Sequence, residues 1–253
     1  MSVHYAAATV VFPRTKAHRM SLASECDHVA VAVPSIEEAA SRWQEGLGGH
    51  WLSPRPEVMS DFATHQLRFN GGGKLELLEP TTQTGFAAAF LARFGARIHH
   101  VTLRVPDLLE AVEVVRAAGY DVVDVSTERD EWHEGFLRPS QVGGVIVQLA
   151  HSPLSEEQWA RQRGVDVIPT PVEGPILQGP TFTHPDLDAA EALWRTLGAA
   201  IDRRDDRLIA SWPASPLTVE VHHGDLDIAP VLRFDDAKLV EADPRLGPAT
   251  VLG

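Results

Sequence analysis

The sequence has few of the features that mark a secreted, membrane-bound or nucleic-acid-binding protein. Cys26 is the only cysteine, so no internal disulfide can form. No apolar run approaches the ~18 residues of a transmembrane helix, and the first residues lack the pattern of a signal peptide. Lys and Arg number 22 against 35 Asp and Glu, and the resulting net charge of -13 opposes binding to a phosphate backbone. We therefore expect a soluble, cytoplasmic protein that acts on a small molecule, with no nucleic-acid or membrane partner.

The most informative feature of the sequence is an internal repeat. The segment HVAVAVP at 28–34 recurs as HVTLRVP at 100–106, so His28 and His100 lie 72 positions apart. Each segment is rich in β-branched residues, which is typical of a strand, and each ends at a proline, which cannot donate to a strand ladder. The two segments therefore predict equivalent opening strands of two tandem copies.

The same elements are predicted after each opening strand. An amphipathic helix follows in both copies, capped by Ser35 in the first and by Asp107 in the second. Shorter apolar runs then indicate strands at 65–69 and 74–78 in the first copy, and at 120–125, 135–137 and 145–149 in the second. We expect both copies to share the order βαβββ. The predicted fold class is α+β, with tandem βαβββ modules that form a curved mixed sheet around a cleft.

A weaker third copy is predicted after the pair. The segment HPDLDAA at 184–190 resembles the start of the other helices, and 217–222 resembles the last strand of a copy. We expect this degenerate third module to have no internal partner, because the residues after it are too few for a fourth copy. The predicted organisation is an N-terminal extension at 1–24, a paired domain at 25–152, a helix and linker at 153–178, the third module at 179–225 and an irregular tail at 226–253.

Four side chains at repeat-equivalent positions are candidate metal ligands. Glu76 and Gln148 lie in the last strands of the two copies and, like His28 and His100, are 72 positions apart. If the copies pack about a pseudo-twofold axis, these four side chains can converge in one cleft. Imidazole nitrogens with carboxylate or amide oxygens suit a divalent transition ion, namely Co, Mn, Ni, Zn or Fe. Such an ion could polarise a substrate carbonyl and stabilise an enolate. His99, next to His100 on the strand, is expected to point to the opposite face.

Several segments carry a resemblance to a known family. They are DHVAVAV at 27–33, KLELLEP at 74–80, IHHV at 98–101, FLRP at 136–139 and GVIVQL at 144–149. Together they resemble the vicinal oxygen chelate superfamily, which includes glyoxalase I, extradiol dioxygenases, bleomycin resistance proteins and methylmalonyl-CoA epimerases. Among these the epimerases are the most similar. The resemblance covers residues 25–150 and does not extend to the rest of the chain.

The resemblance implies a metal-dependent epimerase. It implies that His28, Glu76, His100 and Gln148 hold the ion, that the substrate is an acyl-CoA, and that a metal-stabilised enolate forms when the α-proton is removed. A homodimer is also allowed for. The family usually has a carboxylate, which can serve as a base, where Gln148 stands, and a histidine where Arg138 stands. Glutamine can coordinate through its oxygen but cannot accept a proton at neutral pH.

The sequence leaves the bases and the reaction open. Glu76 and Gln148 are candidate catalytic residues, and Asp61 is a candidate second base, with Glu57 as its alternative. An extradiol-type dioxygenase or lyase of the same superfamily is one alternative function, because two histidines and one carboxylate can hold Fe²⁺. A small-molecule binding or resistance protein without turnover is the other, and the neutral Gln148 favours it.

Overall fold

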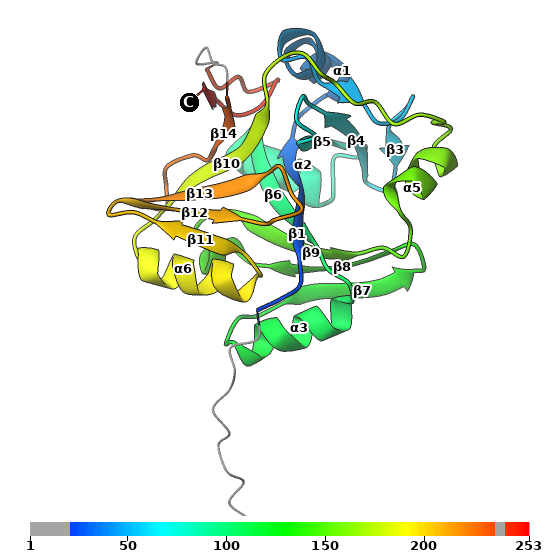
Figure 1. Cartoon of the computed structure of the whole chain (residues 1–253). Coiled ribbons are helices and arrows are strands. Elements are labelled where there is room, and N and C mark those ends of the chain that lie inside the picture. The colour runs from blue at the N-terminus through cyan, green and yellow to red at the C-terminus, as the bar shows by residue number, and fades with distance from the viewer. Residues whose placement is uncertain (1–20, 236–240, 253) are drawn as a thin grey trace, which may run out of the picture.

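The computed structural model describes residues 21–235 and 241–252. Within them the chain forms two mixed sheets with helices on their outer faces (Figure 1). The elements of the first half are β1 (Glu25–Ala32), α1 (Ile36–Ala40), its π-helical continuation η1 (Ser41–Gly46), β2 (His50–Trp51), β3 (Glu57–Val58), β4 (Phe62–Arg68), β5 (Lys74–Pro80), α2 (Phe86–Phe94), β6 (Arg97–Arg104), α3 (Leu108–Ala117), β7 (Val123–Arg129), β8 (Trp132–Leu137), α4 (Pro139–Val142) and β9 (Ile146–His151).

The first sheet has nine strands among the described residues and consists of two βαβββ modules side by side. Its strand order is β2-β4-β5-β1-β6-β9-β8-β7, with β3 paired to β4. Opening strand β1 pairs in parallel with β5, and opening strand β6 pairs in parallel with β9. The two opening strands pair antiparallel at the centre. The predicted α+β class with tandem modules is therefore confirmed.

The helices that cover this sheet begin as the sequence predicts. The Ser35 side chain accepts a hydrogen bond from the backbone N–H of Glu38, and Asp107 does the same for Glu110. Helix α3 packs its apolar side against β8 and β9. The sequence analysis missed α2, whose alanine and phenylalanine run carries no capping side chain at its first residue. This helix lies over β5 and β1.

The second half contributes a helix, a linker and a smaller sheet. Its elements are α5 (Glu156–Gln162), β10 (Leu177–His184), α6 (Leu187–Thr196), β11 (Ala200–Arg203), β12 (Arg207–Ser211), β13 (Thr218–His223), β14 (Val231–Phe234) and β15 (Thr250–Leu252). The sheet order is β11-β12-β13-β10-β14-β15. Helix α6 packs against β11, β12 and β13, so the elements from β10 to β13 again follow the order βαβββ.

The expectation of an irregular tail after residue 226 was wrong. Strand β14 pairs antiparallel with β10, and β15 pairs in parallel with β14. In the first sheet β6 has the same relation to β1, and β9 to β6. Strands β14 and β15 therefore take the places beside β10 that β6 and β9 take beside β1. Strands of four and three residues are too short to show a repeat pattern in the sequence.

One continuous apolar core joins the two sheets. Phe69 of the first half and Phe234 of the second are in edge-to-face contact, with ring centroids 5.3 Å apart. Trp43 is fully buried, and its indole N–H donates to the carbonyl of Leu246 at 2.7 Å. The C-terminal segment thus closes over the helix of the first module. None of the described helices is long and apolar enough to cross a membrane.

Candidate metal centre

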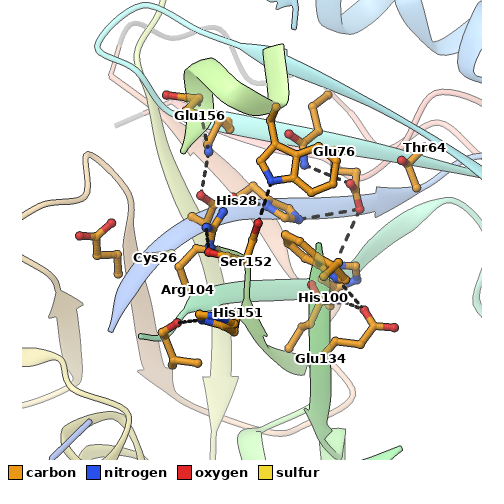
Figure 2. Close-up of a pocket in the computed structure, with 18 of the residues that line it drawn as sticks. Cys26, His28, Thr64, Glu76, His100, Arg104, Glu134, His151, Ser152 and Glu156 are labelled. Atoms are coloured by element: carbon orange, nitrogen blue, oxygen red, sulfur yellow. Dashed lines mark hydrogen bonds and ion pairs between the residues drawn. The ribbon is translucent and has the colours of Figure 1, made fainter. Parts of the chain in front are cut away.

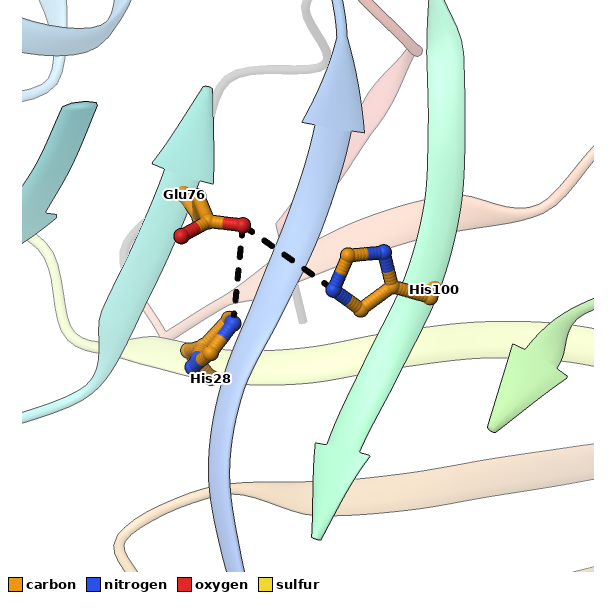
Figure 3. A group of neighbouring side chains, drawn as sticks. All are labelled: His28, Glu76 and His100. Atoms are coloured by element: carbon orange, nitrogen blue, oxygen red, sulfur yellow. Dashed lines mark ion pairs between the residues drawn. The ribbon is translucent and has the colours of Figure 1, made fainter. Parts of the chain in front are cut away.

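Three of the predicted ligands lie together on neighbouring strands. His28 is on β1, Glu76 on β5 and His100 on β6, and one donor atom from each lies within 4.8 Å of the others. Glu76 Oε2 is 3.8 Å from His28 Nε2 and 3.9 Å from His100 Nε2. The three side chains point toward one another across β1 (Figure 3). The spacing leaves room for an ion among them.

Strand register explains why these three residues converge. Ala30 of β1 pairs with Glu76 on one side and with His100 on the other. His28 lies two residues before Ala30, and its side chain is on the same face because side chains alternate along a strand. Both histidines are buried, so neither imidazole faces bulk water.

The orientation of the His28 ring is fixed by Asp27. The Nδ1 atom of His28 lies 2.7 Å from the Asp27 carboxylate, which is also 2.7 Å from Lys74 Nζ. Burial opposes ionisation of Asp27, but the Lys74 ammonium and the His28 hydrogen bond keep its pKa well below the usual range. An ionised Asp27 can only accept, so the neutral ring carries its proton on Nδ1. The Nε2 lone pair then faces the cleft.

A β-bulge determines the position of His100. Ala30 pairs with His100 and Val31 with Ile98, so His99 is an extra residue with no partner on β1. The expectation that His99 points to the opposite face was therefore wrong. The two Nδ1 atoms of His99 and His100 are 2.8 Å apart, and the His99 ring packs against α2, with its centroid 4.6 Å from that of Phe90. A proton on His100 Nδ1 leaves its Nε2 lone pair toward Glu76.

The electrostatics of these side chains suit a bound cation. Burial lowers the pKa of His100 well below its ordinary value and lowers that of His99 to about 4, so both rings are neutral at pH 7. Burial also raises the pKa of Glu76, which indicates that its charge lacks full compensation from the protein. His100 Nε2 is a buried nitrogen with no hydrogen-bond partner. Two imidazole nitrogens and one carboxylate therefore fit a divalent transition ion.

The fourth predicted ligand, Gln148, lies next to this group and is held by hydrogen bonds. Its Nε2 donates to Glu134 at 2.7 Å, and its Oε1 accepts from the Thr102 hydroxyl at 2.7 Å. Thr102 Oγ1 is in turn 3.0 Å from His28 Nε2. Because the single Thr102 hydrogen goes to Gln148, the His28 Nε2 lone pair gains no donor from Thr102. Gln148 is thus connected to the three-ligand group through the Thr102 hydroxyl.

The two candidate second bases lie elsewhere. Asp61 does not line the cleft; its carboxylate lies beside Gly85, and Ser60 donates to it at 3.2 Å. Glu57 does line the cleft, but it forms ion pairs with Arg129 and Arg163. Neither carboxylate is brought to the group of His28, Glu76 and His100.

The group opens into a cleft of about 1520 Å³ that both halves of the chain line (Figure 2). The linker helix α5 lies at its edge, where Glu156 pairs with Arg68 and the indole N–H of Trp159 donates to Ser152 at 3.0 Å. Glu134 of β8 also faces this cleft and was missed in the sequence analysis. It lies two residues before Phe136, the partner of Gln148, so a paired alignment of β8 and β9 could have found it.

Comparison with known proteins assigns the family. A model of the glyoxalase/bleomycin resistance protein/dioxygenase superfamily matches residues 27–136. An ethylmalonyl-CoA/methylmalonyl-CoA epimerase of Cereibacter sphaeroides is 31% identical over 127 residues, which are 49% of this chain and 94% of that protein. The chain belongs to the glyoxalase/bleomycin resistance/dioxygenase superfamily. Another member, the human mitochondrial methylmalonyl-CoA epimerase, is 32% identical over 130 residues, covering 49% of this chain and 71% of that protein.

A solved structure resembles the fold of nearly the whole chain. A hypothetical protein from Staphylococcus aureus has a crystal structure that superposes with a TM-score of 0.63, covering 91% of this chain and 99% of that one. Sequence identity is 10%, so the likeness concerns the fold alone. The epimerase matches span about half of the chain, and the arrangement of both halves has a counterpart in this solved structure.

Proposed function

We propose that the chain is a metal-dependent isomerase of the methylmalonyl-CoA epimerase type, which removes and returns an α-proton of an acyl-CoA. The observation that carries the proposal is the group of His28, Glu76 and His100, in which both Nε2 atoms face the Glu76 carboxylate and the buried Nε2 of His100 has no hydrogen-bond partner. Two relatives that are named as methylmalonyl-CoA epimerases support the substrate class.

Residues of this chain would hold the ion and orient its ligands. His28, Glu76 and His100 would hold the ion, with Gln148 as a further oxygen donor if its side chain turns away from Thr102. Asp27 and His99 keep the two imidazoles in the required orientation and tautomer. A divalent ion bound there would supply a Lewis acid for the substrate carbonyl and so lower the cost of losing the α-proton. The cleft of about 1520 Å³ has room for an acyl-CoA.

The test is solvent deuterium exchange into methylmalonyl-CoA. Protein loaded with Co²⁺ should incorporate deuterium at the α-carbon, and chelator treatment should stop the incorporation. A His100→Ala variant should be inactive, because it removes one of two nitrogen ligands. Absence of exchange in metal-loaded protein, or exchange that survives both chelator and His100→Ala, would contradict the proposal.

A second candidate is an extradiol-type dioxygenase. It is favoured by the composition of the group, since two histidines and one carboxylate are the ligand set of many non-haem Fe²⁺ oxygenases. Oxygen uptake by Fe²⁺-loaded protein with a catechol would support this function. The same protein should show no uptake if it is an isomerase.

A further inference from the structure

Glu134 is the carboxylate that β8 brings beside the metal centre. Its Oε2 accepts a hydrogen bond from Gln148 Nε2 at 2.7 Å and one from the Trp132 indole N–H at 3.0 Å. The Glu134 side chain lies beside His100 in the cleft (Figure 2). The chain Glu134, Gln148, Thr102 and His28 is joined by successive polar contacts of 2.7, 2.7 and 3.0 Å. Glu134 is therefore part of the same polar network as the ligands.

Glu134 is a half-buried carboxylate of the cleft that has no cationic partner among the described residues. Asp27 is paired with Lys74, and Glu57 is paired with two arginines. Glu156 is paired with Arg68 and Lys74, and Glu76 faces the two histidines. The remaining two, Glu25 and Asp124, are exposed at the rim. Glu134 is thus the half-buried carboxylate of the described cleft that lies beside the ligands and forms no ion pair with Lys or Arg.

The identity of residue 148 follows from the presence of Glu134. A carboxylate can only accept, so the amide nitrogen of Gln148 must face Glu134 and its oxygen must face Thr102. A glutamate at 148 would place two carboxylates at hydrogen-bond distance, where they could not both be ionised. One carboxylate and one amide are therefore the stable combination, and here the carboxylate stands on β8 and the amide on β9.

We propose that Glu134 is the catalytic base for one face of the substrate. This inference rests on the proposed function. In the step, the α-C–H bond breaks, its electron pair moves into the adjacent carbonyl to give an enolate, and the proton passes to a Glu134 carboxylate oxygen. The return of a proton from Glu134 to the same carbon reverses the step. In D₂O the returned nucleus is a deuteron, so each cycle labels the substrate without need of any other reactant.

The test compares deuterium exchange and metal affinity in the same variants. Glu134→Gln keeps the size of the side chain but cannot accept a proton, so exchange into methylmalonyl-CoA should fall about 100-fold or more. Its affinity for Co²⁺, followed by visible absorption, should stay within about threefold of the parent, because Glu134 is not among the three ligands. The double variant Glu134→Gln/Gln148→Glu should recover deuterium exchange to within about tenfold of the parent. It moves the carboxylate only to the residue that is hydrogen-bonded to Glu134 in the parent. Glu25→Gln, at the rim, is the matched control and should exchange like the parent.

The outcomes separate the inference from the function on which it rests. If the parent and Glu134→Gln exchange equally, Glu134 is not the base and the isomerase function stands. If Glu134→Gln loses Co²⁺ as well as exchange, Glu134 is a structural support of the metal centre and the inference is overturned. If the Co²⁺-loaded parent does not exchange, the proposed function and the role of Glu134 fall together. Exchange that appears only in the single Gln148→Glu variant would likewise overturn both the proposed function and the role of Glu134.

Discussion

The two sheets of this protein place an equivalent glutamate in opposite electrostatic surroundings. Glu76 pairs across the sheet with Ala30 of β1, and Glu220 pairs in the same way with Thr181 of β10. Glu76 faces the imidazoles of His28 and His100. Glu220 instead lies 2.9 Å from Arg207, 3.3 Å from Arg233 and 2.8 Å from His222. The same backbone arrangement thus presents an uncompensated carboxylate in one sheet and a neutralised one in the other.

Register identifies the substitutions behind this difference. Two residues before Thr181, where β1 has His28, β10 has Gly179, and a Cβ there would meet the Thr218 carbonyl oxygen at 2.1 Å. Val231 of β14 pairs with Thr181 as His100 pairs with Ala30. Arg233 stands opposite Gly179, where the first sheet has Thr102 opposite His28. In the second sheet, which has no imidazoles at these positions, the Arg233 guanidinium thus compensates the glutamate charge that a bound cation would compensate in the first sheet.

The largest expected effect is on metal affinity. Glu76→Gln should weaken Co²⁺ or Zn²⁺ binding more than about 100-fold. This loss is larger than the loss expected when a residue that only supports a ligand is changed. Glu220→Gln should leave the affinity unchanged, because its sheet offers no imidazole pair. Isothermal titration of both variants measures the contrast. Equal losses in the two variants would break the comparison, since they would place an ion in both sheets.

The second sheet should respond through stability instead. Glu220→Gln leaves the half-buried Arg233 guanidinium beside Arg207 without a carboxylate, which should lower the free energy of unfolding by about 3 kcal/mol. We take the low end of the usual range because the Arg207 side chain is 34% exposed. Urea denaturation of chelator-treated protein measures the effect. A loss below about 1 kcal/mol would mean that the arginines are solvated rather than held by Glu220.

A pH dependence should come from the first sheet. The pKa of His99 is lowered by burial to about 4, against about 6.5 in the unfolded chain. The unfolded state therefore binds more protons between these values, so the stability from neutral His99 is complete above pH 6.5 and is lost as pH falls toward 4. The loss should be on the order of 3 kcal/mol in metal-free protein. His99→Phe should reduce this acid sensitivity, and an unchanged pH profile in that variant would assign the effect to other groups.

The smallest expected effect sharpens the role of the bulge at His99. His99→Phe keeps a ring against Phe86 and Phe90 but removes the hydrogen bond to His100 Nδ1. Co²⁺ affinity at pH 7.5 should fall about 10- to 100-fold, as for other residues that orient a ligand. His99→Asn, which can still form a hydrogen bond, should recover part of the loss. Equal affinity in all three proteins would show that packing alone positions His100.

The internal repeat in the sequence predicts much of the architecture of the first sheet. The 72-residue offset predicted the two βαβββ modules. It also made His28 equivalent to His100, and Glu76 to Gln148, because a duplicated backbone repeats its inward-facing positions. Only the tertiary structure revealed the bulge at His99, since a bulge changes side-chain direction without changing the sequence pattern. Only strand pairing brought Glu134 to Gln148, and only packing gave the tail its two strands. These features depend on contacts between distant segments, which local periodicity does not record.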